Sequence, residues 1–273
     1  MESMPPEPER VINPGEERAD AALSGTEWLC PAAPRGHEMP QSWHELARAT
    51  TACGDELVLR ERAGTFEIRC NGWDLMSNRA HYSEQWMAHT ACKRLPTDAP
   101  RVLIGGLGMG FTLRAALDVL PAAAQVVVAE LLPEIIVWNR GVLASLAHRP
   151  LDDLRLCLAC ADVADLLRPD SFDAIVLDVD NGPDAVMLRG NASLYAPEGV
   201  QQMQRALRPG GVLAVWSASP SIRFEQILRA AGLPWDRADV PARGRESDPL
   251  HSIYRATQAV ATRGATPQYG SSL

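Results

Sequence analysis

Three glycines and one acid carry the first chemical signal in this chain. Gly106, Gly108 and Gly110 follow the apolar residues 102–104, and Glu130 ends the next apolar run. Glycines let a backbone approach a ligand, and a carboxylate at a strand end can accept hydrogen bonds from both hydroxyls of a ribose. The spacing therefore predicts a nucleoside-binding βαβ unit with these four residues at the ligand. A tight turn without a ligand is the alternative.

Acids also end the two apolar runs that follow. Asp162 comes after residues 154–160, and Asp178 comes after residues 172–177, with Asp180 two positions further on. The carboxyl ends of successive strands in an open parallel sheet converge on one crevice, where such folds bind their ligands. We therefore expect these acids to face the same pocket as the glycines. For the last two acids, loop solvation or helix capping is the alternative.

Helical segments alternate with these strands. Residues 111–120, 133–146 and 197–207 have the pattern of helices, and the last of them stops at the Arg-Pro-Gly-Gly of residues 208–211. An apolar strand resumes at residues 212–217. The alternation predicts an α/β fold with a doubly wound sheet.

A smaller β structure is expected before this sheet. Residues 56–60 and 65–69 alternate polar and apolar positions around Ala63-Gly64, which is typical of a β-hairpin, and residues 83–95 follow as a helix. The expected organisation is a flexible extension over 1–42, a small β-domain with its linking helix over 43–95, a nucleotide-binding catalytic domain over 96–260 and a flexible tail over 261–273.

Residues 55–254 resemble the spermidine synthase family, the polyamine aminopropyltransferases. The family's glycine motif, roughly Ile-Gly-Gly-Gly-Asp-Gly-Gly-x-Leu-Arg, resembles residues 104–114. Its Tyr-His-Glu resembles residues 82–84, and its Asp-x-x-Asp-Pro loop, followed by Gly-Pro, resembles residues 178–183. The resemblance implies a doubly wound, mostly parallel, seven-stranded Rossmann-like sheet with a small N-terminal β-hairpin domain, within the class I S-adenosylmethionine-dependent methyltransferase superfamily.

The resemblance also implies roles for the site residues. Glu130 would take the ribose and Asp162 the adenine amino group of S-adenosylmethionine, or of its decarboxylated form, as the co-substrate. An amine must be neutral when it attacks the carbon bonded to the sulfonium, so a carboxylate is needed to receive its proton. We predict that Asp178 is this carboxylate. Asp180 would bind a second ammonium or orient the first, and Tyr82 would contribute a phenolic hydroxyl.

The chain departs from the family motifs where they meet the donor. The family uses an aspartate in the glycine motif to hold the free amine of decarboxylated S-adenosylmethionine, and residues 107–109 contain no acid. A hydrogen bond to a charged group contributes about 1.5–3 kcal/mol. In addition, Ser83 replaces the histidine of Tyr-His-Glu, and the loop after Asp178 is shortened.

These departures favour methyl transfer from S-adenosylmethionine to a small amine or related nucleophile. S-adenosylmethionine is then expected to bind at least as tightly as the decarboxylated donor. Aminopropyl transfer from decarboxylated S-adenosylmethionine is the first alternative. A non-catalytic nucleotide-binding relative is the second, because a fold alone does not establish an activity.

Composition limits the partners. The 273 residues have a net charge of -8, which argues against nucleic acid and would mildly steer cations toward the protein. No segment approaches the roughly 18 uninterrupted apolar residues of a membrane span, and residues 1–10 lack the apolar core of a signal peptide. We therefore expect a cytoplasmic enzyme with a small-molecule substrate and no membrane partner. The family resemblance also implies a homodimer.

The cysteines and histidines predict no metal site. Cys157 and Cys160 form a Cys-x-x-Cys inside an apolar run, and no second pair lies at the spacing of a zinc site. We expect both to be buried free thiols. His81 and His89 are eight residues apart, more than two helical turns, which does not suit a shared metal.

Overall fold

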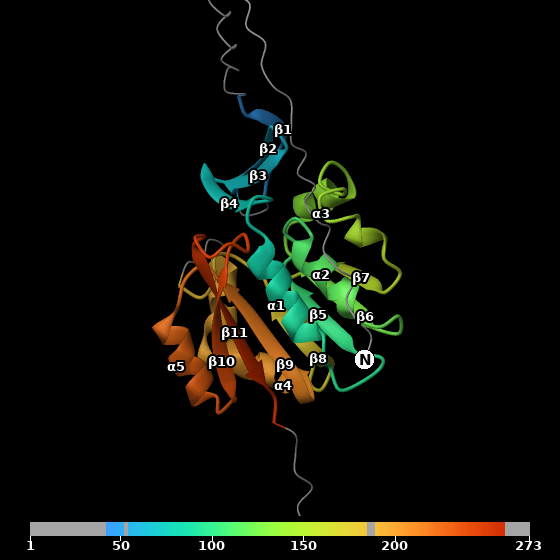
Figure 1. Ribbon diagram of the computed structural model, residues 1–273, viewed down its shortest axis with the longest axis vertical. Coiled ribbons are helices and arrows are strands. Elements are labelled where there is room, and N and C mark those ends of the chain that lie inside the picture. Colours follow the sequence, from blue (N-terminus) through green and yellow to red (C-terminus); the bar gives the residue numbers. More distant parts are fainter. Residues whose placement is uncertain (1–41, 52–53, 185–188, 260–273) are drawn as a thin grey trace, which may run out of the picture. The chain divides into compact units, whose positions relative to one another are not determined.

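A computed structural model describes residues 42–51, 54–184 and 189–259 (Figure 1). The expected extension up to residue 41 and the expected tail lie outside these residues. The described residues all belong to one compact unit. In chain order the elements are β1 (His44–Thr50), β2 (Glu56–Arg62), β3 (Thr65–Cys70), β4 (Trp73–Ser77), α1 (Tyr82–Cys92), β5 (Arg101–Gly105), α2 (Phe111–Val119), β6 (Gln125–Glu130), α3 (Pro133–Arg140), η1 (Pro150–Asp152), β7 (Leu156–Cys160), η2 (Val163–Leu166), β8 (Phe172–Leu177), η3 (Arg189–Tyr195), α4 (Pro197–Ala206), β9 (Leu207–Ser217), α5 (Ile222–Ala230), β10 (Trp235–Pro241) and β11 (Leu250–Thr257).

The N-terminal β structure is a four-stranded antiparallel sheet in the order β1-β2-β3-β4. The predicted hairpin is its central pair, β2 and β3, and its alternation buries Leu57, Leu59 and Ile68 completely. β4 follows a turn at Asn71 and Gly72, both with positive φ. Asn-Gly is a strong sequence signal for a two-residue hairpin turn, so this extra strand could have been predicted. β1 is an edge strand with mostly exposed residues, which leaves no apolar pattern to detect.

The second sheet has seven strands in the order β10-β11-β9-β8-β5-β6-β7. The five strands from β5 to β9 pair in parallel, and β11 and β10 add an antiparallel edge. This confirms the predicted doubly wound, mostly parallel sheet. The chain runs outward from β5 through β6 to β7 and then returns to β8 on the other side of β5. Folds of this kind bind ligands at such a switch point.

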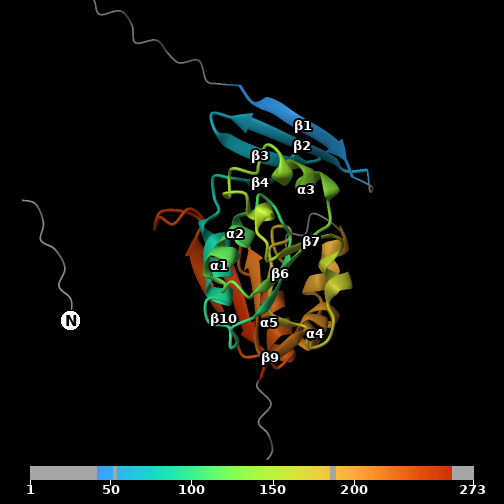
Figure 2. The ribbon, with the colours of Figure 1, turned by 90° about the vertical axis from the view of Figure 1, so that its right-hand side faces the viewer.

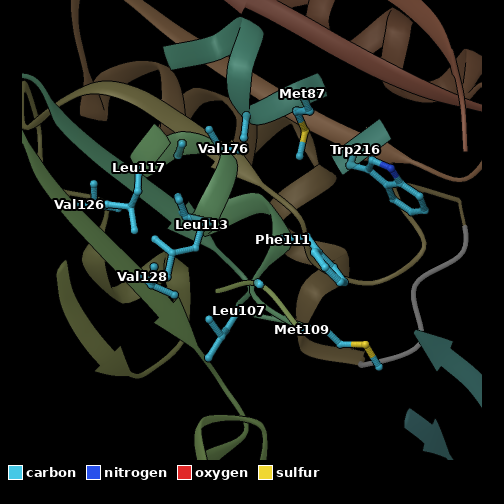
Figure 3. Packing of buried hydrophobic residues seen from close by; sticks show 14 of the residues in the cluster. Met87, Leu107, Met109, Phe111, Leu113, Leu117, Val126, Val128, Val176 and Trp216 are labelled. Atoms are coloured by element: carbon cyan, nitrogen blue, oxygen red, sulfur yellow. The ribbon is translucent and has the colours of Figure 1, made fainter. Parts of the chain in front are cut away.

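Helices cover both faces of this sheet. Figure 2 shows α1 and α2 on one side of the strands and α4 on the other. Leu113 and Leu117 of α2 share a core cluster with Val126 and Val128 of β6 (Figure 3), whereas Val127 packs on the opposite face in a cluster that includes α4. Because successive side chains of a strand point to opposite faces, an uninterrupted valine run can fill two cores.

Two helix and strand boundaries differ from those predicted. The helix expected over 133–146 ends at Arg140, where Gly141 leaves helical geometry. The Pro-Gly turn expected between α4 and β9 lies inside β9 as a bulge, because Phe172 pairs with Leu207 and Ala174 with Val212. None of the described helices is long and apolar enough to cross a membrane.

The Cys-x-x-Cys prediction was wrong on burial. Cys157 and Cys160 are free thiols, as expected, but both are exposed. They lie on β7, which forms an edge of the seven-stranded sheet, so the apolar run is only partly covered. Within the residues that the structure describes, no group of three or more His, Cys, Asp or Glu side chains could hold a metal ion.

Candidate functional site

Two neighbouring cavities lie at the carboxyl ends of β5 and β8. They share Leu75 and Met76 of β4, Gly108 of the glycine loop, and Asp178 and Asp180 from the loop after β8. We refer to the one that reaches β6 as the first cavity and to the one that reaches β9 and β11 as the second cavity. The second is the larger, about 260 Å³ against about 70 Å³.

Gly106 allows the loops after β5 and β8 to approach each other. It has φ +89°, and a Cβ there would lie 2.1 Å from the carbonyl oxygen of Asp178. Gly106 lines the first cavity and Gly108 lines both. Gly110 is not among the residues of either cavity. It precedes the first turn of α2 and packs against Pro150, so the structure gives it a role in the turn.

Glu130 and Asp162 line the first cavity, where the sequence placed them. The two oxygens of Glu130 each accept a backbone N–H at 2.9 Å, one from Leu107 and the other from Leu132. Burial raises the pKa of Glu130, and these hydrogen bonds act in the opposite direction. Asp162 accepts the N–H of Ala164 at 2.9 Å. A carboxylate oxygen has two lone pairs, so both side chains keep acceptor capacity for a ligand.

Asp178 is the carboxyl at the junction of the two cavities. Its Oδ2 accepts a hydrogen bond from the Thr112 hydroxyl at 2.5 Å. Burial raises the pKa of Asp178 to about 6, against the lowering effect of the Thr112 bond. Burial and the nearby charge of Asp178 raise the pKa of Glu84 well above its ordinary value. The pair therefore shares less than two full negative charges near neutral pH.

Asp180 also faces both cavities, beside Asp178, as expected for acids of one pocket. β8 has already ended there, and Asp180 has φ +54°. The Asn191 side chain donates to Oδ2 of Asp180 at 2.6 Å, and the Tyr195 hydroxyl donates to the carbonyl of Val179 at 2.7 Å. These bonds from η3 fix the loop.

Tyr82 is not brought to either cavity. It is the first residue of α1, is 42% exposed, and lines a separate surface groove with Trp86 and His89. Successive helical residues are turned by about 100°, so Ser83 and Glu84 point inward where Tyr82 does not. In the sequence, Glu84 stands out only as the third residue of the motif at residues 82–84. Its side chain lines the second cavity and is the site carboxyl that the prediction missed.

A second missed feature joins three elements. The indole N–H of Trp216 in β9 donates to the Ser83 hydroxyl at 3.0 Å, and that oxygen lies 2.8 Å from Nδ1 of His251 in β11. The rings of Trp216 and His251 meet edge to face at 4.7 Å. Both rings line the second cavity, as does Met109 of the glycine loop. No local spacing could reveal a contact between residues 168 positions apart.

The charges of the cavities have one sign. Glu84, Asp178 and Asp180 line the second cavity, and the first contains two further acids. Among the described residues, neither cavity is lined by a lysine or an arginine. The arrangement can bind a cation, can receive a proton at Asp178, and offers no cationic side chain to a carboxylate.

The chain was compared with known proteins. No family model matches it. It is 29% identical over 170 residues to a polyamine aminopropyltransferase of Mycobacterium tuberculosis, and 26% identical over 147 residues to one of Saccharolobus islandicus. The matches cover 60% and 53% of this chain. The chain spans 31% of the length of the mycobacterial protein and 48% of that of the Saccharolobus protein.

Solved structures share its fold. A spermidine synthase from Thermotoga maritima matches with a TM-score of 0.64 at 19% identity, covering 79% of this chain and 73% of its own. A spermidine synthase in complex with the transition state analogue AdoDATO matches with a TM-score of 0.63 at 18% identity and the same coverage. The chain thus resembles polyamine aminopropyltransferases in sequence and spermidine synthases in fold, which confirms the resemblance predicted from its motifs.

Proposed function

We propose that this chain transfers an aminopropyl group from decarboxylated S-adenosylmethionine to an amine. The second cavity carries the proposal, because among the described residues three carboxyl groups line it and no lysine or arginine does. S-adenosylmethionine carries a carboxylate that these acids would repel, whereas the charged groups of its decarboxylated form, a sulfonium and an ammonium, are all positive. The names of the curated relatives support the same reaction.

Glu84 changes the balance between methyl and aminopropyl transfer. The sequence argument for methyl transfer rested on the missing acid in residues 107–109 and on the shortened loop after Asp178. Glu84 lies in the same cavity as Leu107 and Met109, and hydrogen-bonds to none of the described residues. Its carboxyl is therefore free to take a donor amine that the glycine loop does not hold. This observation supports placing aminopropyl transfer first.

The proposed reaction uses the two cavities together. The nucleoside occupies the first cavity, with the ribose at Glu130 and the adenine near Asp162. The amine enters the second cavity and attacks the carbon attached to the sulfonium. A bond forms between the amine nitrogen and the aminopropyl carbon while the bond from that carbon to sulfur breaks. The electron pair of the broken bond stays on sulfur, which gives methylthioadenosine. Asp178, with a pKa of about 6, is ionised near neutral pH and receives the proton of the amine.

Methyl transfer is the second candidate, favoured by the absence of an acid in residues 107–109. The two reactions leave different products. The full chain would be incubated with each donor and a panel of amines, and the nucleoside product identified by mass spectrometry. We expect methylthioadenosine from the decarboxylated donor, and preferential binding of that donor in calorimetry.

Two other results would contradict the proposal. S-adenosylhomocysteine as the main product would establish methyl transfer. Donor binding without either product, across the whole panel, would indicate a binding protein.

A further inference from the structure

We propose that His251 positions the acceptor by donating a hydrogen bond from Nε2 to a neutral oxygen of that molecule. The acceptor is then an amine that also carries a hydroxyl, ether or amide oxygen. The inference rests on the proposed function in one respect, namely that the amine acceptor binds in the second cavity.

The direction of the hydrogen bonds fixes the protonation of His251. The indole nitrogen of Trp216 can only donate, so Ser83 Oγ accepts from it at 3.0 Å. The hydroxyl proton of Ser83 must then find an acceptor, since this side chain is fully buried. Among the described residues, the acceptor within reach is Nδ1 of His251 at 2.8 Å. Nδ1 therefore bears a lone pair, and the ring proton is on Nε2.

The opposite assignment would leave a buried proton without a partner. If Nδ1 carried the proton, Ser83 Oγ would accept two N–H groups and its own hydrogen would have no acceptor among the described residues. A doubly protonated ring meets the same obstacle. Burial also lowers the pKa of His251, which keeps the ring neutral. The relay from Trp216 through Ser83 thus presents a neutral imidazole with a fixed donor.

The free donor selects a type of ligand atom. No described residue accepts a hydrogen bond from Nε2, and the ring lines the second cavity with Glu84, Asp178 and Asp180. An ammonium offers only N–H donors and cannot pair with Nε2–H. A carboxylate would be repelled by the three acids. A neutral oxygen satisfies the donor without either penalty, while the acids hold the ammonium end.

Nitrogen-15 NMR of the histidine rings tests the relay directly. Six histidines are present, and the signals of His251 are assigned by their loss in His251→Gln. At neutral pH we expect the Nε2–H tautomer. In Ser83→Ala the fixed tautomer should give way to a mixture. An imidazolium or an Nδ1–H ring in the unmodified protein would overturn the proposal.

The same spectra test the ligand without requiring turnover. Titration with 4-amino-1-butanol should shift the Nε2 signal, whereas 1,4-diaminobutane should leave it in place. A shift with the diamine and none with the amino alcohol would overturn the proposal. If turnover is absent while the amino alcohol still shifts Nε2, the proposed function fails and the His251 subsite stands.

Kinetics provide the second measurement. With the decarboxylated donor, kcat/KM for the amino alcohol should exceed that for the diamine by about two- to tenfold, the range expected for one neutral hydrogen bond. His251→Phe should abolish this preference, and the matched variant His89→Phe, on the exposed side of α1, should keep it. A wild-type preference for the diamine would contradict the proposal, whether or not the variants fold.

Discussion

Asp178 accepts a hydrogen bond from Thr112 and interacts with Glu84. Because asparagine has nearly the same shape as aspartate, Asp178→Asn removes the charge with little change in shape. In Asp178→Asn the amide oxygen can still accept from Thr112, but the side chain cannot take a proton. We expect turnover to fall by about 10²- to 10⁴-fold, the usual contribution of general acid–base catalysis. Donor affinity, measured by calorimetry, should change by less than about threefold.

The control for this variant is the exposed Asp98→Asn, which should keep normal turnover. Full activity in Asp178→Asn would assign the proton to Glu84 or Asp180, the other acids of the second cavity.

The raised pKa of Asp178 also predicts how stability depends on pH. Its pKa is about 6 in the folded protein against an ordinary value of 3.8. Above pH 6 the folded state holds a buried charge that unfolding would release into water. This cost is present at neutral pH and disappears as the pH falls through 6 toward 4. Asp178→Asn removes it.

We therefore expect Asp178→Asn to be more stable than the unmodified protein at pH 8, by at most about 3 kcal/mol, since one pKa unit corresponds to about 1.4 kcal/mol. Urea denaturation at pH 8 and at pH 4.5 would measure the difference, which should shrink at the lower pH. An equal difference at both values would show that packing is the cause.

At the scale of elements, the loops after β5 and β8 depend on Gly106. Its φ of +89° is unfavourable for other residues, and a Cβ would overlap the Asp178 carbonyl. We expect Gly106→Ala to lower the free energy of unfolding by about 3 kcal/mol or more and to abolish donor binding. Gly72→Ala is the matched control, because Gly72 also has positive φ but has open space around it. Its cost should be about 1 kcal/mol. Equal losses by chemical denaturation would contradict the steric argument.

The sequence predicted the order of the strands and helices, but not which side of each helix faces the site. Apolar runs followed by acids located β6, β7 and β8, and thereby Glu130, Asp162 and Asp178, because side chains at strand ends are fixed by the sheet itself. The helix α1 was found, but its rotation was not, so Tyr82 was chosen in place of its inward neighbour Glu84. Contacts between distant elements, as between Ser83 and His251, depend on packing that no local pattern contains.

At the scale of the whole molecule, the net charge of -8 and the acidic cavities should both attract cationic substrates and so raise their rate of association. Salt screens such attraction, with a Debye length of about 10 Å at 0.1 M. We expect kcat/KM for 1,4-diaminobutane to fall severalfold as salt rises from about 0.02 M to about 0.3 M. Steady-state rates in a potassium chloride series would show this. A sucrose series controls for viscosity, and a rate independent of salt would exclude steering.

The wall shared by the two cavities has a thermodynamic consequence. Met76, Gly108, Asp178 and Asp180 line both, so a donor seated in the first cavity becomes part of the surface that the second molecule meets. In the proposed reaction the sulfonium would lie beside the carboxyls that attract the incoming ammonium. The two ligands would then compete for the same negative charge even though they occupy different spaces. By linkage, whatever factor the donor imposes on the affinity for the acceptor, the acceptor imposes on the affinity for the donor.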